Sequence, residues 1–459
     1  MATVLGANTL SSGGYQVDNS VRLFSNTLMT MTPSGAPTNA DISTLSFWTK
    51  LAGLGTERSP IFAAGNGGGV HFRADTEQVD FYNGGGSLRT TQQFKDVSAW
   101  YHIVLRTDTT DGTANDRLRV YVNGTQVTDF AQRTNPDQNA NTHLGSAVEH
   151  HIGCNTDAAN FFNGYLAEVC FIDGLSLGPD SFGEFDSDSE IWKPIKVSGL
   201  TYGKNGFYLE FKSGGNLGDE DKGTQTADWS ETNLTAVDQS TDTCTNNFAI
   251  INSLDNFYYA STLSEGNLKQ TCNSGNYSFN TSTFGVSQGK WYVEVKTSGD
   301  DMRNAIGITD KVSTGTTDAL ETLPNGWSYQ QGEVYNNSSV VANLGTFSSG
   351  NIVGIYLDLD NNELYFAING SIQNSGTGLS VTASSSTTNG NYFFAFGDNA
   401  SSNTDVNEVN FGSPSFAISS GNTDANGYGN FEYDPSAGTF DGASKDFYAL
   451  NTKNLAEFG

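Results

Sequence analysis

The sequence is poor in cysteine, proline and basic residues. Its 459 residues include 4 Cys, 9 Pro and 22 Lys or Arg against 50 Asp or Glu, which gives a formal charge of −28. A field of that sign repels phosphate backbones and anionic lipid, so we expect no nucleic-acid partner. No run of about 18 apolar residues is present, so we expect no membrane insertion. The first residues show no signal-peptide pattern, so we expect the protein to be made in the cytoplasm.

The few cysteines exclude a cysteine-rich metal or redox site, because none lies in a CxxC spacing. Cys154 and Cys170 lie in neighbouring apolar segments, where buried free thiols are ordinary. Cys244 and Cys272 flank one connecting segment and are the candidates for a disulfide, with two more structural thiols as the alternative.

Motifs of common enzymes are also missing. The five histidines form no HxxH or HExxH pattern. The letters GxSxG occur at Gly174-Leu-Ser-Leu-Gly178 and Gly285-Val-Ser-Gln-Gly289, but no helical pattern follows either, as a nucleophile elbow requires. Gly289-Lys290 is followed by Trp291 rather than Ser or Thr, so it is no phosphate-binding loop. We therefore expect a protein that binds or is displayed rather than an enzyme, and no cofactor other than calcium.

Glycine and aromatic residues are abundant instead, with 52 Gly, 29 Phe and 19 Tyr. Long segments with helical periodicity are absent, whereas short alternating segments bounded by turn residues recur. The fold class predicted is all-β, with two antiparallel β-sandwich (jelly-roll) domains in tandem. The expected boundaries are 1–213 for the first sandwich, 214–270 for a connector, 271–415 for the second sandwich and 416–459 for a C-terminal extension.

Each predicted sandwich contains an Asn-Gly hairpin downstream of a Trp-Tyr strand. Asn123-Gly124 follows Trp100-Tyr101, and Asn369-Gly370 follows Trp291-Tyr292. A type I′ turn needs positive φ at both central positions, which Asn-Gly supplies. This match indicates either that the two halves share an architecture or only that any two Asn-Gly hairpins have similar sequences.

Strand segments in each half carry family resemblances. Those of the first half are Ser46-Phe-Trp, Trp100-Tyr-His-Ile-Val, Leu118-Arg-Val-Tyr-Val-Asn-Gly and Gly164-Tyr-Leu-Ala-Glu-Val. They resemble the laminin-G-like, concanavalin-A-like jelly rolls of lectins and glucanases. Those of the second half are Gly289-Lys-Trp-Tyr-Val-Glu-Val, Ile306-Gly-Ile and Val353-Gly-Ile-Tyr-Leu-Asp-Leu-Asp. They resemble a SPRY domain.

A further string of segments is more specific. It comprises Phe185-Asp-Ser-Asp, Ile191-Trp-Lys-Pro, Asn205-Gly-Phe-Tyr-Leu-Glu-Phe, Asp242-Thr-Cys-Thr-Asn-Asn-Phe-Ala and Phe447-Tyr-Ala-Leu-Asn-Thr-Lys-Asn-Leu. Together these are similar to virion structural proteins of marine and other tailed bacteriophages, which usually have Pro where this chain has Cys244. The resemblance implies a fibre or capsid-decorating protein on the particle surface, assembled in the host cytoplasm. Its implied partners are other virion proteins, further copies of the chain in a homo-oligomer such as a trimer, and a host-surface glycan.

Two other functions stay open. A bacterial lectin-like adhesin would share the sandwich folds. A degenerate jelly-roll glucanase is the third reading, because Glu168-Val-Cys170-Phe-Ile-Asp173 occupies the frame of the Glu-x-Asp-x-x-Glu motif of laminarinases. The middle Asp is Cys and the last Glu is a shorter Asp, which disables the carboxylate pair that retaining hydrolysis needs.

Several residues are candidates for binding sites. Asp108, Asp111 and Asp116 crowd one turn and offer hard oxygen ligands for Ca²⁺, although charged residues are also common in solvated loops. The aromatic candidates could stack on a sugar while a neighbouring amide donates a hydrogen bond, or they could belong to the cores. The carbohydrate-binding candidates are Tyr82, Asn83, Trp327 and Tyr329.

Overall fold

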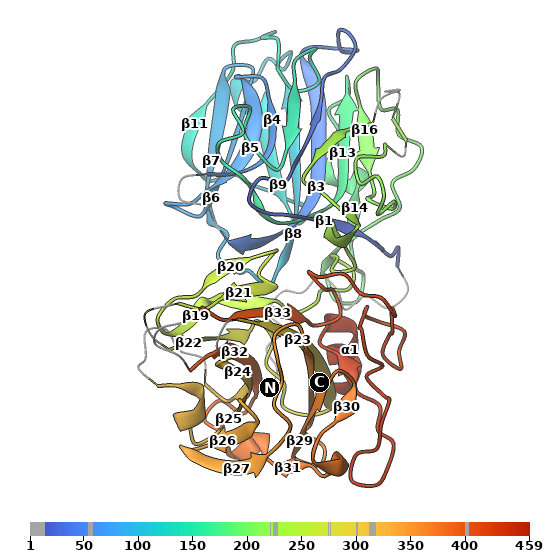
Figure 1. Ribbon diagram of the computed structural model, residues 1–459. Helices are drawn as coiled ribbons and strands as arrows, with labels where there is room; N and C mark the ends of the chain where they lie inside the picture. The colour runs from blue at the N-terminus through green and yellow to red at the C-terminus, as the bar shows by residue number, and fades with distance from the viewer. Residues whose placement is uncertain are drawn as a thin grey trace. The chain divides into compact units, whose positions relative to one another are not determined.

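The computed structural model describes residues 14–53, 58–220, 222–223, 228–273, 275, 277–299, 302–311, 318–399 and 404–459 (Figure 1). The chain divides into two compact units at Asn246 and Asn247. Each unit is a sandwich of β-sheets whose strands pair almost entirely antiparallel. The prediction of two tandem antiparallel sandwiches is confirmed.

One sheet of the first sandwich is built on the long strand β3, which pairs with β8 on one side and β13 on the other. The strand order is β10-β9-β8-β3-β13-β1-β18, with β16 also beside β13. The bounds are β1 Ser20–Leu23, β3 Ile42–Gly53, β8 Trp100–Asp108, β9 Leu118–Val122, β10 Thr125–Gln126, β13 Asn163–Asp173, β16 Phe207–Leu209 and β18 Gln239–Ser240.

The other sheet of this sandwich has the order β11-β7-β6-β5-β4-β12-β2-β17. Its alternation is strict: Val70, Phe72, Val79, Phe81 and Leu88 enter the core, and the residues between them face away. The bounds are β2 Leu28–Met31, β4 Arg58–Ala64, β5 Gly68–Arg73, β6 Gln78–Asn83, β7 Gly86–Gln93, β11 Phe130–Thr134, β12 His150–Ile152 and β17 Ser230–Thr232. A separate two-stranded ribbon joins β14 Gly183–Phe185 to β15 Trp192–Pro194.

The second sandwich also has two sheets. One has the order β19-β22-β32-β24-β25-β26-β27, with bounds β19 Ile251–Tyr258, β22 Ser278–Ser282, β24 Asn304–Thr309, β25 Gly326–Gln330, β26 Glu333–Asn336, β27 Ser339–Asn343 and β32 Phe393–Asp398. The other has the order β20-β21-β33-β23-β28-β29-β30, with β31 beside β29 and β34 beside β23. Its bounds are β20 Thr262–Ser264, β21 Lys269–Thr271, β23 Lys290–Ser298, β28 Ile352–Asp358, β29 Glu363–Ile368, β30 Ser371–Ile372, β31 Leu379–Ser380, β33 Val406–Asn410 and β34 Tyr448–Ala449.

Helical structure is limited to short segments in the described residues. The α-helix α1 runs over Thr452–Phe458 and is capped by Asn451, whose side chain accepts a hydrogen bond from the Asn454 amide. The 3₁₀ turns are η1 Ala114–Asp116, η2 Pro179–Ser181, η3 Ala236–Asp238, η4 Leu320–Thr322, η5 Asn374–Gly376 and η6 Ser384–Ser386.

Both predicted hairpins form as expected. Asn123 and Gly124 have φ of 47° and 77° between β9 and β10, and Asn369 and Gly370 have φ of 47° and 76° between β29 and β30. In each hairpin the Asn side chain accepts a hydrogen bond from a neighbouring backbone amide, that of His102 at 2.8 Å or Ile352 at 2.9 Å. The two hairpins therefore share a second feature that the sequence match did not reveal.

An aromatic ring from later in the chain covers each hairpin glycine. A Cβ added at Gly124 would lie 2.2 Å from the Trp192 ring, and one at Gly370 would lie 2.5 Å from the Tyr433 ring. Trp192 also stacks on His102 at 5.8 Å and donates its indole N–H to His102 Nδ1 at 2.9 Å. Segments beyond the sandwich strands thus bind the sheet faces turned away from the cores.

The segment predicted as a connector, 214–270, is shared between the two sandwiches. β17 and β18 complete the sheets of the first sandwich, and β19, β20 and β21 those of the second. Beyond β18, the buried Asp242 carboxylate pairs with Lys50 Nζ at 2.7 Å and accepts the Trp100 indole N–H at 3.0 Å. These contacts extend the first unit to Asn246, beyond the predicted boundary at 213.

The C-terminal extension packs against the second sandwich. The Glu294 carboxylate on β23 is fully buried and accepts the backbone amides of Glu432 at 3.0 Å and Tyr433 at 2.7 Å. Phe431, Phe440 and Phe447 join the sheet tyrosines in one aromatic cluster. The extension is therefore a structural part of this domain.

All four cysteines are buried free thiols, as expected for Cys154 and Cys170. The predicted disulfide between Cys244 and Cys272 is not formed. A shared connecting segment in the sequence does not by itself bring two thiols together. The two residues belong to different compact units, because the chain divides at Asn246 and Asn247.

Candidate functional site: a polar hollow on the first sandwich

A row of polar side chains crosses the outer face of the sheet that contains β5, β6, β7 and β11. His71 lies opposite Asp80, Asp80 opposite Arg89, and Arg89 opposite Gln132. Residues directly opposite in an antiparallel pair have Cβ atoms about 4.5–5.5 Å apart. The register therefore brings four polar side chains from four strands into one continuous line.

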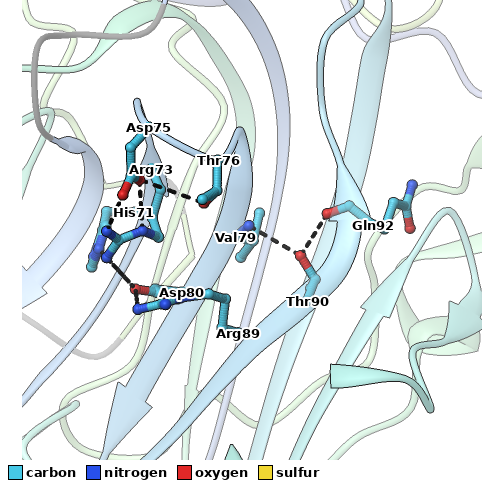
Figure 2. A network of polar contacts seen from close by, with 9 residues as sticks. All are labelled: His71, Arg73, Asp75, Thr76, Val79, Asp80, Arg89, Thr90 and Gln92. Atoms are coloured by element: carbon cyan, nitrogen blue, oxygen red, sulfur yellow. Dashed lines mark hydrogen bonds and ion pairs between the residues drawn. The ribbon is translucent and has the colours of Figure 1, made fainter. Parts of the chain in front are cut away.

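Asp80 is the centre of this row (Figure 2). Its Oδ1 accepts from Arg89 Nε at 2.7 Å and its Oδ2 from Arg89 Nη2 at 3.2 Å, a bidentate pair. Arg73 Nη1 and His71 Nε2 each lie 3.4 Å from Oδ2. Burial alone would raise the pKa of Asp80, but the nearby His71 and the hydrogen-bonded Arg89 hold that pKa well below its ordinary value. The carboxylate is thus a fixed, ionised acceptor.

Arg73 is held from a second direction. Its Nη2 pairs with Asp75 Oδ2 at 2.6 Å and its Nε donates to Asp75 Oδ1 at 2.8 Å (Figure 2). The carboxylates of Asp75 and Asp80 therefore fix the guanidinium of Arg73 from two directions.

This row forms part of a hollow of about 410 Å³, within the roughly 300–1,000 Å³ of small-ligand sites. Tyr82 lines it beside the row. Its ring lies over Gly69, where an added Cβ would come within 2.7 Å of the hydroxyl, and meets His71 edge-on at 5.9 Å. The turn after β4 and the loop after β12 contribute further polar groups. These groups are those of Asn66, Asn155, Thr156 and Asp157.

Of the predicted sugar-binding residues, only Tyr82 lines this hollow. Asn83 is fully buried, because its Oδ1 accepts the His143 amide at 3.0 Å and its Nδ2 donates to Thr107 at 3.2 Å. Adjacent strand residues point to opposite faces, so the two candidates separate. Asn83 fixes loops and offers no group to a ligand.

The second pair of predicted residues, Trp327 and Tyr329, lies inside the second sandwich. Trp327 packs edge-on against Tyr392, and Tyr329 packs against Phe347 with its hydroxyl donating to the Gly345 carbonyl. Neither ring presents a face to a sugar in this structure.

The predicted calcium ligands serve their own turns instead. Asp108 Oδ1 accepts from the Thr110 amide at 3.2 Å, Asp111 Oδ1 accepts from the Thr113 amide at 2.8 Å, and Asp116 pairs with Arg119 at 2.9 Å. Within the described ranges, no three His, Cys, Asp or Glu side chains form a group that could hold a metal ion. The three aspartates therefore do not converge on one point.

The glucanase-like frame is divided between two structural roles. Asp173 accepts backbone amides from Thr38, Lys204 and Asn205 at 2.7–3.1 Å. Glu168 lies at an irregularity in β13 with φ of 52°, where it is 6% exposed and accepts the Tyr208 hydroxyl. Both carboxylates are thus buried and occupied by hydrogen bonds within the fold.

Sequence comparison assigns a family to each sandwich. Residues 25–175 match the family model of the concanavalin A-like lectin/glucanases superfamily, and residues 289–411 match that of the SPRY domain. The chain carries these two domains in tandem. The polar hollow belongs to the concanavalin A-like domain. No curated protein sequence matches the chain.

Solved structures show more distant likeness. The SPRY domain of human HERC1 is 14% identical over 35% of this chain and 96% of that one, with a TM-score of 0.29. A heptameric SAP-like pentraxin from Limulus polyphemus is 12% identical over 36% of this chain and 80% of that one, with a TM-score of 0.27. At these values neither structure assigns a function to this chain.

No helix in the described part of the chain is long and apolar enough to cross a membrane.

The sequence indicates one lining residue of the hollow, Tyr82, but not its row of polar residues. His71, Asp80 and Arg89 occupy alternate positions on strands with an apolar face, which is also the pattern of any solvated sheet surface. β11 is polar and was not predicted as a strand. Only the pairing register could have indicated that these residues meet.

Proposed function

We propose that the protein is a lectin-like, non-enzymatic binding protein whose concanavalin A-like domain holds a saccharide in the polar hollow. The tandem of a concanavalin A-like and a SPRY domain supports a binding role of this kind. The observation that carries the proposal is the row His71, Asp80, Arg89 and Gln132 beside the half-buried ring of Tyr82.

The chemistry of this row suits sugar hydroxyls. A hydroxyl both donates and accepts hydrogen bonds, and the row offers an ionised acceptor in Asp80, a guanidinium donor in Arg89 and an amide in Gln132. The Tyr82 ring supplies an apolar surface for the C–H face of a sugar ring. Ion pairs already hold Asp80 and Arg89, so little side-chain entropy is lost when a ligand binds.

The arrangement favours binding without hydrolysis. The hollow contains the carboxylates of Asp80 and Asp157, and Asp80 is kept ionised by its cationic partners. A general acid needs a raised pKa, which Asp80 lacks. Glu168 and Asp173, the two carboxylates of the glucanase frame, are buried on β13 and do not line the hollow.

A glycan panel tests the proposal with the full-length chain. We expect at least one oligosaccharide to bind the wild-type protein and Tyr82→Ala to weaken that binding by about tenfold, since aromatic contacts contribute roughly 0.5–1.5 kcal/mol beyond burial. Tyr259→Ala is the matched control, because Tyr259 is 48% exposed in the second domain and away from the hollow's lining. Equal weakening by both variants, or no binding to any glycan, would reject the site.

The absence of hydrolysis is tested separately. We expect no reducing-sugar release from laminarin or from any glycan that binds. Release that is lost in Glu168→Gln would show a glucanase and overturn this part of the proposal.

We further propose that the protein is displayed on a bacteriophage particle as a homo-oligomer, with the hollow facing a host glycan. The resemblance of the Asp242-Thr-Cys-Thr-Asn-Asn-Phe and Phe447-Tyr-Ala-Leu-Asn-Thr segments to virion proteins supports this, as does the strongly acidic composition. Mass spectrometry of purified virions should detect the chain. A gene neighbourhood without virus genes, or secretion by a host bacterium, would favour the adhesin instead.

A further inference from the structure

One cation of the hollow, Arg58, has no anionic partner among the residues that the structure describes. Arg58 begins β4 and is exposed, and it lies opposite Arg73 on the same face of the sheet. Within the described ranges its guanidinium makes no hydrogen bond or ion pair, whereas Arg73 and Arg89 are both held by carboxylates. Of the arginines that line the hollow, Arg58 is therefore the one whose charge no described carboxylate neutralises.

Arg58 lies in the same hollow as the Tyr82 ring. Both residues line the hollow, and burial raises the pKa of the Tyr82 hydroxyl while the charge of Arg58 partly lowers it. A sugar ring against Tyr82 would thus place its substituents within the field of Arg58. Arginine binds planar carboxylates and tetrahedral oxyanions in a bidentate manner.

The local charge differs from that of the whole chain. The lining contains Arg58 and Arg89 against Asp80 and Asp157, so it is neutral, while the chain carries −28. At physiological ionic strength charges more than about 8 Å away are largely screened. The distant carboxylates therefore do not prevent an anion from reaching Arg58.

We infer that the hollow selects an acidic saccharide, one whose carboxylate or sulfate pairs with Arg58 while its ring contacts Tyr82. This inference rests on the proposed glycan site and specifies its ligand class. Arg58 acts as a specificity residue, because the row around Asp80 can bind hydroxyls of any sugar.

The experiment compares matched probes on the full-length protein by titration calorimetry. The probes are oligogalacturonate, its carboxyl-reduced neutral counterpart and a sulfated galactan oligosaccharide. We expect one of the acidic probes to bind at least about tenfold more tightly than the neutral one, as for a charge-assisted contact. Arg58→Gln should weaken the binding of that acidic probe by at least about tenfold and so remove this preference.

Lys95→Gln is the control. It removes the same charge from an exposed side chain of the same domain that pairs with Glu77 at 3.0 Å and does not line the hollow. It should change the affinity for every probe less than twofold. The two acidic probes distinguish a carboxylate from a sulfate, and selective binding of either supports the inference.

Failure of the inference and failure of the proposed function give different results. If the neutral probe binds as tightly as the acidic ones, and Arg58→Gln has no effect, the acidic specificity is rejected while the glycan site stands. If neither these probes nor any glycan of the wider panel binds the wild-type protein, both are rejected.

Discussion

Protonation of Glu168 should make the stability of the concanavalin A-like domain depend on pH. This carboxyl group is buried on β13, with the Tyr208 hydroxyl donating to Oε2 and the Tyr15 hydroxyl 3.4 Å from Oε1. Burial raises its pKa from the ordinary 4.5 to about 7, and the nearby Glu210 carboxylate adds to the rise. Between about pH 4.5 and 7, the folded state therefore keeps a proton that the unfolded state has already released.

The sign and size follow from this difference. A carboxyl group with a raised folded-state pKa contributes stability that is fully present below about pH 4.5 and is lost as pH rises through about 7. A shift of this size corresponds to about 3 kcal/mol. Glutamine does not titrate and resembles the protonated acid at every pH, so Glu168→Gln should remove this contribution to the pH dependence of stability.

The assay is calorimetric unfolding of the full-length chain at several pH values from 4.5 to 8. The quantity to follow is the wild-type free energy of unfolding minus that of Glu168→Gln, which should fall by about 3 kcal/mol across the range. Subtraction cancels other groups, including His102, whose pKa burial lowers to about 3 and which destabilises the fold as pH falls.

A counterpart in the SPRY domain supplies the control. Burial raises the pKa of Asp398 on β32 to about 7, and Asp398→Asn should shift the unfolding of that domain with the same sign. The two variants should therefore affect different transitions. A wild-type minus Glu168→Gln difference that is constant from pH 4.5 to 8 would refute the reasoning.

Three further predictions concern stability and can be measured by urea unfolding. Glu294→Gln places an amide NH₂ where the carboxylate accepts four donors, including the Glu432 and Tyr433 amides, and should lower the free energy of unfolding by about 3 kcal/mol. The control Asp360→Asn breaks an exposed ion pair and should lower it by less than about 1 kcal/mol, and an equal effect would contradict the role of Glu294. Asp242→Asn leaves Lys50 buried without its anion and should cost about 3–5 kcal/mol, so a near-neutral result would mean that the pair does not secure this segment. Both Gly370 and Gly390 have positive φ, so Gly390→Ala alone should destabilise the fold by more than about 1 kcal/mol. Gly370→Ala should destabilise it more, because an added Cβ at Gly370 would lie 2.5 Å from the Tyr433 ring, and equal losses would exclude the ring contact.

Much of the fold could be predicted from local patterns. The strands β5, β6, β8, β9, β23, β28 and β29 all coincide with segments of alternating or continuous apolar residues, and both Asn-Gly turns have the positive φ that their residues favour. These features depend on neighbouring residues only. The strand β11 and the helix α1 lacked such a signal and were missed.

The binding candidates were harder to predict. Alternation shows that Tyr82 and Asn83 face opposite sides of β6, but it does not show which side a loop covers. Trp327 and Tyr329 are buried against Tyr392 and Phe366, which belong to segments further along the chain. Burial is a property of the assembled layers, so a local pattern cannot supply it.

The sequence by itself determined that this chain forms two antiparallel sandwiches with an Asn-Gly hairpin in each, because turn chemistry and period-2 alternation act over a few residues. Only the tertiary structure decided that His71, Asp80, Arg89 and Gln132 form one row and that Arg58 lines the same hollow. The physical reason is register. A shift of one residue between neighbouring strands turns every side chain to the other face, and the contacts of the whole sheet fix that register.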